Sequence, residues 1–233
     1  MSVWQATISW LTTAAHWSGP EGITTRVIQH LTLSALSLAL ACAVALPLSL
    51  WLGHIGRGGF LAIAVTNVGR AVPTFALLSV FSLTALGFSN RSVVLALVLF
   101  GIPPVLTNAY TALRDVDPDV VEAARGVGMT GPQVLARVEL PLALPLVVNG
   151  IRLAAVQIVA TLTIAALVAG PGLGRIISQG FGTHNNGETV AGALLVVALA
   201  VVVEGLFALA QRRLRPSQEN RNKPSGILVA DPS

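Results

Sequence analysis

The chain has 233 residues, of which 54% are hydrophobic and 10% are charged, with a net charge of +4. Soluble domains usually carry about 25% charged residues, so this chain lacks the polar side chains that a water-exposed surface needs. The single cysteine, Cys42, excludes a disulfide framework and a cysteine metal site. We therefore expect a membrane protein, with no metal and no nucleic acid bound, whose basic residues orient it in the bilayer.

Residues 1–22 precede the first long apolar run. Trp4, Trp10 and Trp17 recur there every six or seven residues. This spacing favours a short helix lying in the membrane interface, where tryptophan is common. A flexible N-terminus is the alternative interpretation.

Five apolar segments follow, and each is long enough to cross a membrane, which takes about 20 residues. The second is longer than one crossing needs, so we expect an interfacial elbow at its start and the crossing within 67–87. An all-α membrane protein with about five transmembrane helices in residues 23–215 follows from this pattern. The five segments are 27–52, 59–87, 92–113, 142–169 and 189–210.

Two further segments are poor in long apolar runs. The glycine-rich stretch 170–187 has no GxxxxGK[ST] pattern, which excludes a phosphate-binding loop. We expect a re-entrant turn there that caps the helices from outside. The tail 216–233 is polar and rich in proline and serine, and it is predicted to be disordered in the cytoplasm.

Basic residues are distributed unevenly around the five segments. If the polar loop 114–141 is cytoplasmic, nine basic residues lie inside and three lie outside, as the positive-inside rule favours. The N-terminus is then outside and the C-terminus inside. The three outer residues are Arg26, Arg91 and Arg175, and the nine inner ones are Arg57, Arg114, Arg125, Arg137, Arg212, Arg213, Arg215, Arg221 and Lys223.

Prolines and polar residues inside the apolar segments mark a candidate pathway. A proline in a membrane helix leaves a carbonyl without its donor, which is tolerated beside another helix or a water-filled cavity. Glu204 could be a functional carboxylate or a partner of Arg152. Hydrogen bonding between helices is the alternative for Gln157, and Asn108 lies near the cytoplasmic end of its helix. The candidate pathway residues are Pro73, Pro103, Asn108, Gln157 and Glu204.

The polar loop 114–141 is predicted to form two short helices. Pro118 is placed to open the first helix, and Gly126 and Gly128 end it. Thr130 can cap the second helix, which we expect to end where the fourth apolar segment begins. Two short helices joined by glycines would form a compact knob on the cytoplasmic face, although an ordinary amphipathic connector is the alternative.

The same loop carries a motif of six matching positions: Glu-Ala-Ala, three residues, Gly, nine residues, then aliphatic-x-Leu-Pro. This pattern resembles the signature loop of binding-protein-dependent ABC importer permeases. Val138 is the one departure, because isoleucine is usual there. The matching residues are Glu122, Ala123, Ala124, Gly128, Leu140 and Pro141.

Other stretches resemble one branch of these permeases. Four stretches are similar to the osmoprotectant branch, whose members import glycine betaine, carnitine, choline or related quaternary amines. These stretches are residues 67–78, 102–114, 126–130 and 170–174. A permease for amino acids or another small solute is the first alternative. A membrane-embedded enzyme is less favoured, because no paired carboxylates, histidine cluster or activated nucleophile is evident.

The resemblance implies a type I ABC importer in the plasma membrane of a prokaryote. Two permease subunits, identical or different, would form the pathway, two ATPase subunits would bind beneath, and an extracellular or periplasmic binding protein would deliver substrate. Glu122 would anchor the ATPase, Ala123 and Ala124 would allow close approach, and Gly128 would permit the turn. Val138, Leu140 and Pro141 complete the predicted ATPase-coupling set. This chain has no nucleotide-binding motif, so we expect no cofactor here and ATP on the partner.

Overall fold

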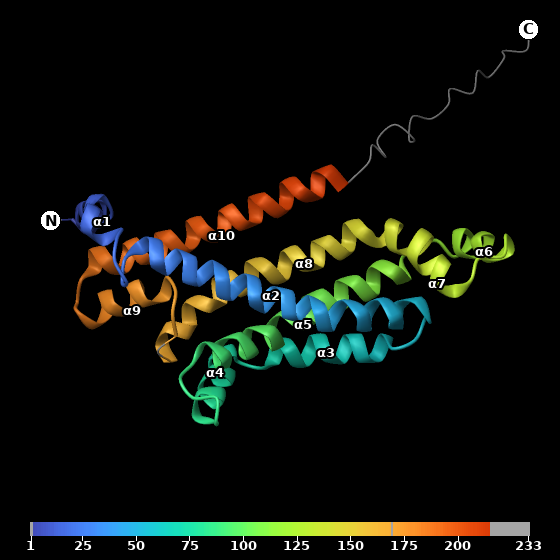
Figure 1. The fold of residues 1–233 in the computed structure, drawn as a ribbon, viewed down its shortest axis with the longest axis horizontal. Helices are drawn as coiled ribbons and strands as arrows, with labels where there is room; N and C mark the ends of the chain where they lie inside the picture. The colour runs from blue at the N-terminus through green and yellow to red at the C-terminus, as the bar shows by residue number, and fades with distance from the viewer. Residues whose placement is uncertain (1, 169, 215–233) are drawn as a thin grey trace, which may run out of the picture.

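The computed structural model describes residues 2–168 and 170–214; the predicted disordered tail 216–233 lies outside them. Within these ranges the chain is helical and contains no strand. Figure 1 shows long helices running side by side along one axis, with α6 and α7 at one end and α1 and α9 at the other. We call the two ends inner and outer, following the orientation expected from the basic residues.

Four long helices are apolar enough to cross a membrane, or five spans if one bent helix pair is counted as a span. The prediction of about five transmembrane helices therefore holds. Their mutual contacts centre on α5, which packs against both α2 and α8. The four long helices are α2 (Ile23–His54), α5 (Asn90–Arg114), α8 (Leu140–Leu162) and α10 (Asn186–Leu214).

The second span differs from the prediction. It consists of α3 (Gly59–Ala71) and α4 (Thr74–Leu83), which are bent by 80° relative to each other. α3 lies along the bundle axis and α4 turns across it (Figure 1). A continuous crossing within 67–87 with its elbow at the start was therefore wrong. Pro73 explains the break, because it has no N–H to donate and favours the extended backbone seen at Val72.

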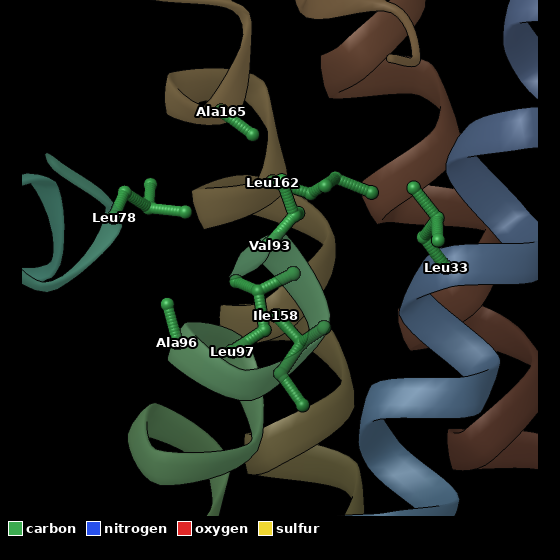
Figure 2. Close-up of a cluster of buried hydrophobic side chains, with 8 residues drawn as sticks. All are labelled: Leu33, Leu78, Val93, Ala96, Leu97, Ile158, Leu162 and Ala165. Carbon is green, nitrogen blue, oxygen red and sulfur yellow. The ribbon is translucent and has the colours of Figure 1, made fainter. Parts of the chain in front are cut away.

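The helices are held together by apolar clusters that contain many small residues. Gly101 and Gly150 lie at crossings so close that an added Cβ would approach Ile158 Cδ1 to 2.9 Å and Asn108 Cβ to 2.6 Å, respectively. Small residues of this kind let membrane helices approach closely and gain van der Waals contact. Figure 2 shows one cluster, formed by Leu33, Leu78, Val93, Ala96, Leu97, Ile158, Leu162 and Ala165.

The outer end is covered by the N-terminal segments and by segments within residues 163–182. We call this group the outer cap; it consists of α1 (Val3–Thr12), η1 (Ala14–His16), η3 (Thr163–Val168) and α9 (Gly174–Gly182). α1 packs against α10, where a Cβ on Gly187 would lie 2.8 Å from the backbone of Ala6. The glycine-rich stretch expected as a turn thus contains the helix α9.

Candidate coupling loop and polar cavity

The first helix of the loop 114–141 is α6 (Pro118–Gly126), and its start follows from local chemistry. The Asp117 carboxylate accepts a hydrogen bond of 2.9 Å from the Asp119 N–H. This bond satisfies one of the free N–H groups of the first turn. Pro118 occupies the first turn, where its missing N–H costs nothing.

Gly128 determines how α6 ends. Its φ is +87°, in the left-handed region. The Gly128 N–H donates to the Arg125 carbonyl at 2.9 Å, and the Met129 N–H donates to the Ala124 carbonyl at 3.2 Å. These two bonds form a Schellman motif, which ends a helix and requires a left-handed residue at this position. The expected turn at Gly128 is therefore present.

The second half of the loop is continuous with the fourth span. α7 (Gly131–Val134) begins after Thr130, whose N–H donates to the Gln133 side chain at 2.8 Å. A π-helical turn, η2 (Leu135–Glu139), then leads directly into α8. The expected end of the second helix at Leu140-Pro141 was wrong. The π turn accommodates Pro141, which cannot donate to the carbonyl four residues before it.

The predicted coupling residues do not all face outward. Glu122, Ala123 and Gly128 are exposed, whereas Ala124 is only 8% exposed and packs against the chain itself. Glu122 and Ala123 are therefore accessible to a partner, whereas Ala124 is almost fully covered by the chain itself. Pro141 is exposed, and Val138 and Leu140 are half-buried, on the continuous helix that follows.

An apolar stripe on α6 was missed by the sequence reasoning. Val120 and Val127 are 43% and 82% exposed, and Ala123 lies between them in sequence. Val127 is the cap residue directly after α6, and the spacing of three and four residues places all three on the same side of the helix and its C-terminal cap. That spacing is visible in the sequence and could have identified the stripe. An exposed apolar stripe beside Glu122 is suited to contact another protein.

Three of the five candidate pathway residues share one cavity. Pro103, Asn108 and Gln157 line a cavity of about 110 Å³ between α3, α5 and α8. The lining contains polar groups but no charged side chain among the residues described. The other lining residues are Thr66, Gly69, Phe100, Pro104, Thr107 and Leu153.

Backbone chemistry adds acceptors to this cavity. Pro104 has no N–H, so the carbonyl of Phe100, which is one of the lining residues, loses its intrahelical donor. The Asn108 amide N–H donates to the Pro104 carbonyl at 2.8 Å, which leaves the amide oxygen of Asn108 available. The cavity therefore offers neutral acceptors and one aromatic ring.

The other two candidates lie outside the lining of this cavity. Pro73 is at the bend between α3 and α4. Glu204 is bound at both oxygens by the Arg152 guanidinium, with a distance of 2.9 Å from Nε to Oε2. Arg152 also donates to the Gln211 side chain at 2.9 Å. The partner role foreseen for Glu204 is therefore present and ties α10 to α8.

The pattern of helices, coupling loop and cavity can be compared with known proteins. Residues 45–216 match the family described as "Binding-protein-dependent transport system inner membrane component". The chain belongs to this family. It is the permease component of an ABC importer and a membrane protein, and is not itself an enzyme.

Several curated relatives resemble this permease over most of their length. The choline transport system permease protein OpuBB of Bacillus subtilis is 32% identical over 198 residues, covering 85% of this chain and 91% of that protein. The carnitine transport permease protein OpuCD of Listeria monocytogenes is 34% identical, covering 84% and 87%. The osmoprotectant import permease protein OsmW of Salmonella typhimurium is 35% identical, covering 81% and 89%.

Solved structures share the fold of this permease. An inward-facing structure of the MetNI methionine ABC transporter has a TM-score of 0.73 at 22% identity, covering 83% of this chain and 96% of that chain. A structure of an amino acid ABC transporter with histidines has a TM-score of 0.72 at 18% identity, covering 89% and 98%. The expected all-α architecture of a type I importer permease is confirmed.

Proposed function

We propose that this permease imports quaternary-amine osmoprotectants such as glycine betaine, carnitine or choline. The main support is its 32–35% identity, over more than four fifths of the chain, to permeases named for choline, carnitine and osmoprotectant transport. The structural neighbours named for methionine and amino acids are at most 22% identical and support the fold alone.

The polar cavity has chemistry compatible with such a substrate. A quaternary ammonium group cannot donate a hydrogen bond, and it is attracted to carbonyl dipoles and aromatic faces. The cavity offers the Asn108 amide oxygen and the ring of Phe100, without a charged side chain among its described lining residues. At about 110 Å³ it is small. We therefore propose that Pro103, Asn108 and Gln157 contact the substrate briefly during passage and do not hold it tightly.

The coupling loop is the proposed docking site for the ATPase. The stripe of Val120, Ala123 and Val127 would enter an apolar groove of the ATPase, while Glu122 would supply a charged anchor. Gly128 would set the direction of the chain after the stripe. ATP would bind to the ATPase and not to this chain. A second permease subunit and a substrate-binding protein at the outer end would complete the importer.

The substrate proposal is tested by uptake into vesicles. The permease is purified with its co-expressed ATPase, reconstituted with ATP inside, and supplied with the binding protein and radiolabelled glycine betaine, carnitine or choline. We expect uptake only when both ATP and the binding protein are present. Methionine uptake that no quaternary amine competes with would overturn the proposed substrate, while leaving the assignment as a permease in place.

A further inference from the structure

A buried polar contact joins α2 to the segment that follows α6. His54 is in the last turn of α2, and Glu139 is the last residue of the π-helical turn. The His54 Nδ1–H donates to Glu139 Oε2 at 2.6 Å, and the two side chains are only 17% and 7% exposed. A carboxylate with so little access to water depends on its partner, because an unpaired buried charge is strongly unfavourable.

The surroundings of this pair bring three spans together. An apolar cluster at the inner end includes Leu50 of α2, Leu113 of α5 and Val147 of α8, with Leu135 of the π turn. α2 and α5 are in close contact, since a Cβ on Gly53 would lie 2.8 Å from Leu113 Cβ. The pair is therefore set in a tightly packed junction between the spans and the coupling loop.

His54 touches both ends of the segment that joins α6 to α8. It binds Glu139 at the end of that segment, and a Cβ on Gly131, at its beginning, would lie 3.3 Å from His54 Nε2. The other long-range hydrogen bonds of α2 side chains within the described residues are at the outer end, where His30 and Gln29 bind Val159, Leu173 and Gly172. At the inner end, this pair is the polar connection between α2 and the coupling loop.

We propose that the His54–Glu139 pair is a positioning element that makes α2 move together with the coupling loop. Glu139 occupies the unspecified position of the aliphatic-x-Leu-Pro motif, so the motif assigns it no role. When the ATPase moves α6, the continuous helix from α7 to α8 carries Glu139 with it, and the hydrogen bond transmits the movement to α2. Without the pair, the ATPase still binds α6 and hydrolyses ATP, but less of that hydrolysis drives transport. This inference rests on the proposed docking of the ATPase on α6.

The test measures substrate transported per ATP hydrolysed, in vesicles containing the complete complex with its ATPase and binding protein. His54→Leu and Glu139→Leu are each expected to lower this ratio by roughly tenfold, as loss of a buried charged hydrogen bond would. The double Leu variant should be no worse than the poorer single variant, because both remove one interaction. His54→Asn keeps a donor near the position of Nδ1, and Glu139→Gln keeps the acceptor, so both should retain most of the ratio.

Two further variants separate the possible failures. The exchanged pair, His54→Glu with Glu139→His, restores the interaction and is expected to recover the ratio even if each Leu variant assembles poorly. A normal ratio in His54→Leu, or an exchanged pair as poor as the single variants, would overturn the inference. Failure of the docking proposal is recognised separately: Val127→Asp would then leave the ATPase co-purifying with the permease.

Discussion

The coupling loop and the outer cap close opposite ends of the same helices in different ways. α6 is shaped by bonds within a few residues: the cap from Asp117 and the Schellman motif at Gly128. The outer cap is held by contacts between distant parts of the chain. His30 accepts from the Leu173 N–H and binds the Val159 carbonyl, across 143 and 129 residues of sequence.

The local bonds of α6 and the long-range contacts of the outer cap go together with different surfaces at the two ends. α6 exposes an apolar stripe, and the hydrogen bonds that define its two ends lie within the loop itself. An exposed apolar stripe of this kind is suited to contact a partner protein. In the outer cap, Trp10 and Leu11 pack against the buried residues Ile23, Leu173, Ile176 and Val196. The outer cap therefore packs directly on the spans, so a movement of the spans can be transmitted to the outer surface.

The largest effect is expected from Gly128→Val. A β-branched residue in the left-handed region costs roughly 1–2 kcal/mol, and the Schellman motif that directs the chain after α6 would be lost. Uptake should fall by at least about tenfold while the permease still inserts in the membrane. Open space surrounds the position of a Cβ at Gly128 within the chain, so the effect would be conformational.

Gly128→Asn is the matched control, because asparagine adopts the left-handed conformation more readily than other residues with a side chain. It should retain a substantial part of the uptake. Equal loss in both variants would show that ATPase contact, and not backbone conformation, requires glycine here. Normal uptake by Gly128→Val would show that the loop is only a connector.

A smaller effect is expected in the cavity between the two ends. Gln157→Leu removes an amide dipole from the lining, and we expect uptake to fall by about threefold to tenfold, as loss of one polar contact with the passing substrate would give. ATP hydrolysis should persist. Gln179→Leu makes the same substitution in α9 of the outer cap and should change uptake by less than about twofold. Equal losses in the two variants would contradict a special role for the cavity.

The smallest effect on transport is expected from loosening the outer cap. Gly187→Leu would clash with Ala6 and separate α1 from α10, with a cost of about 1–3 kcal/mol for overpacking. The temperature of thermal unfolding in detergent should fall by a few degrees, with uptake still measurable. Gly182→Leu, at a position with open space around it, should leave that temperature unchanged. Complete loss of uptake in Gly187→Leu would show that the outer cap is as critical as the coupling loop.

The parts that sequence reasoning predicted are those determined by local chemistry. Pro118, Gly128 and Thr130 marked both limits of α6 and the start of α7, because caps and left-handed glycines leave characteristic residues. The motif around Glu122 identified the family, and apolar length identified the spans. The same reasoning treated Ala123 and Ala124 alike, since only the packed structure distinguishes the exposed one from the buried one.

The parts that sequence reasoning did not predict depend on contacts between distant residues. Pro73 was identified as a proline inside the second apolar segment, but the 80° bend that it makes between α3 and α4 was not predicted, because the direction of α4 depends on packing against α5. The loop helix was expected to end at Leu140-Pro141, but the π turn before Pro141 makes it continuous with α8. The His54–Glu139 pair joins residues 85 positions apart, and no local pattern indicates that such residues meet.

The proposed coupling places the contact with the ATPase on the exposed face of α6. In a Cys42→Ala background, single cysteines at Ala123 and Ala124 would carry a photoactivatable crosslinker in the intact complex. We predict that the label at the exposed position 123 crosslinks to the ATPase subunit and that the label at the buried position 124 gives little or no product. Equal crosslinking from both positions, or none from position 123 in a complex that hydrolyses ATP, would show that the ATPase does not bind the exposed face of α6.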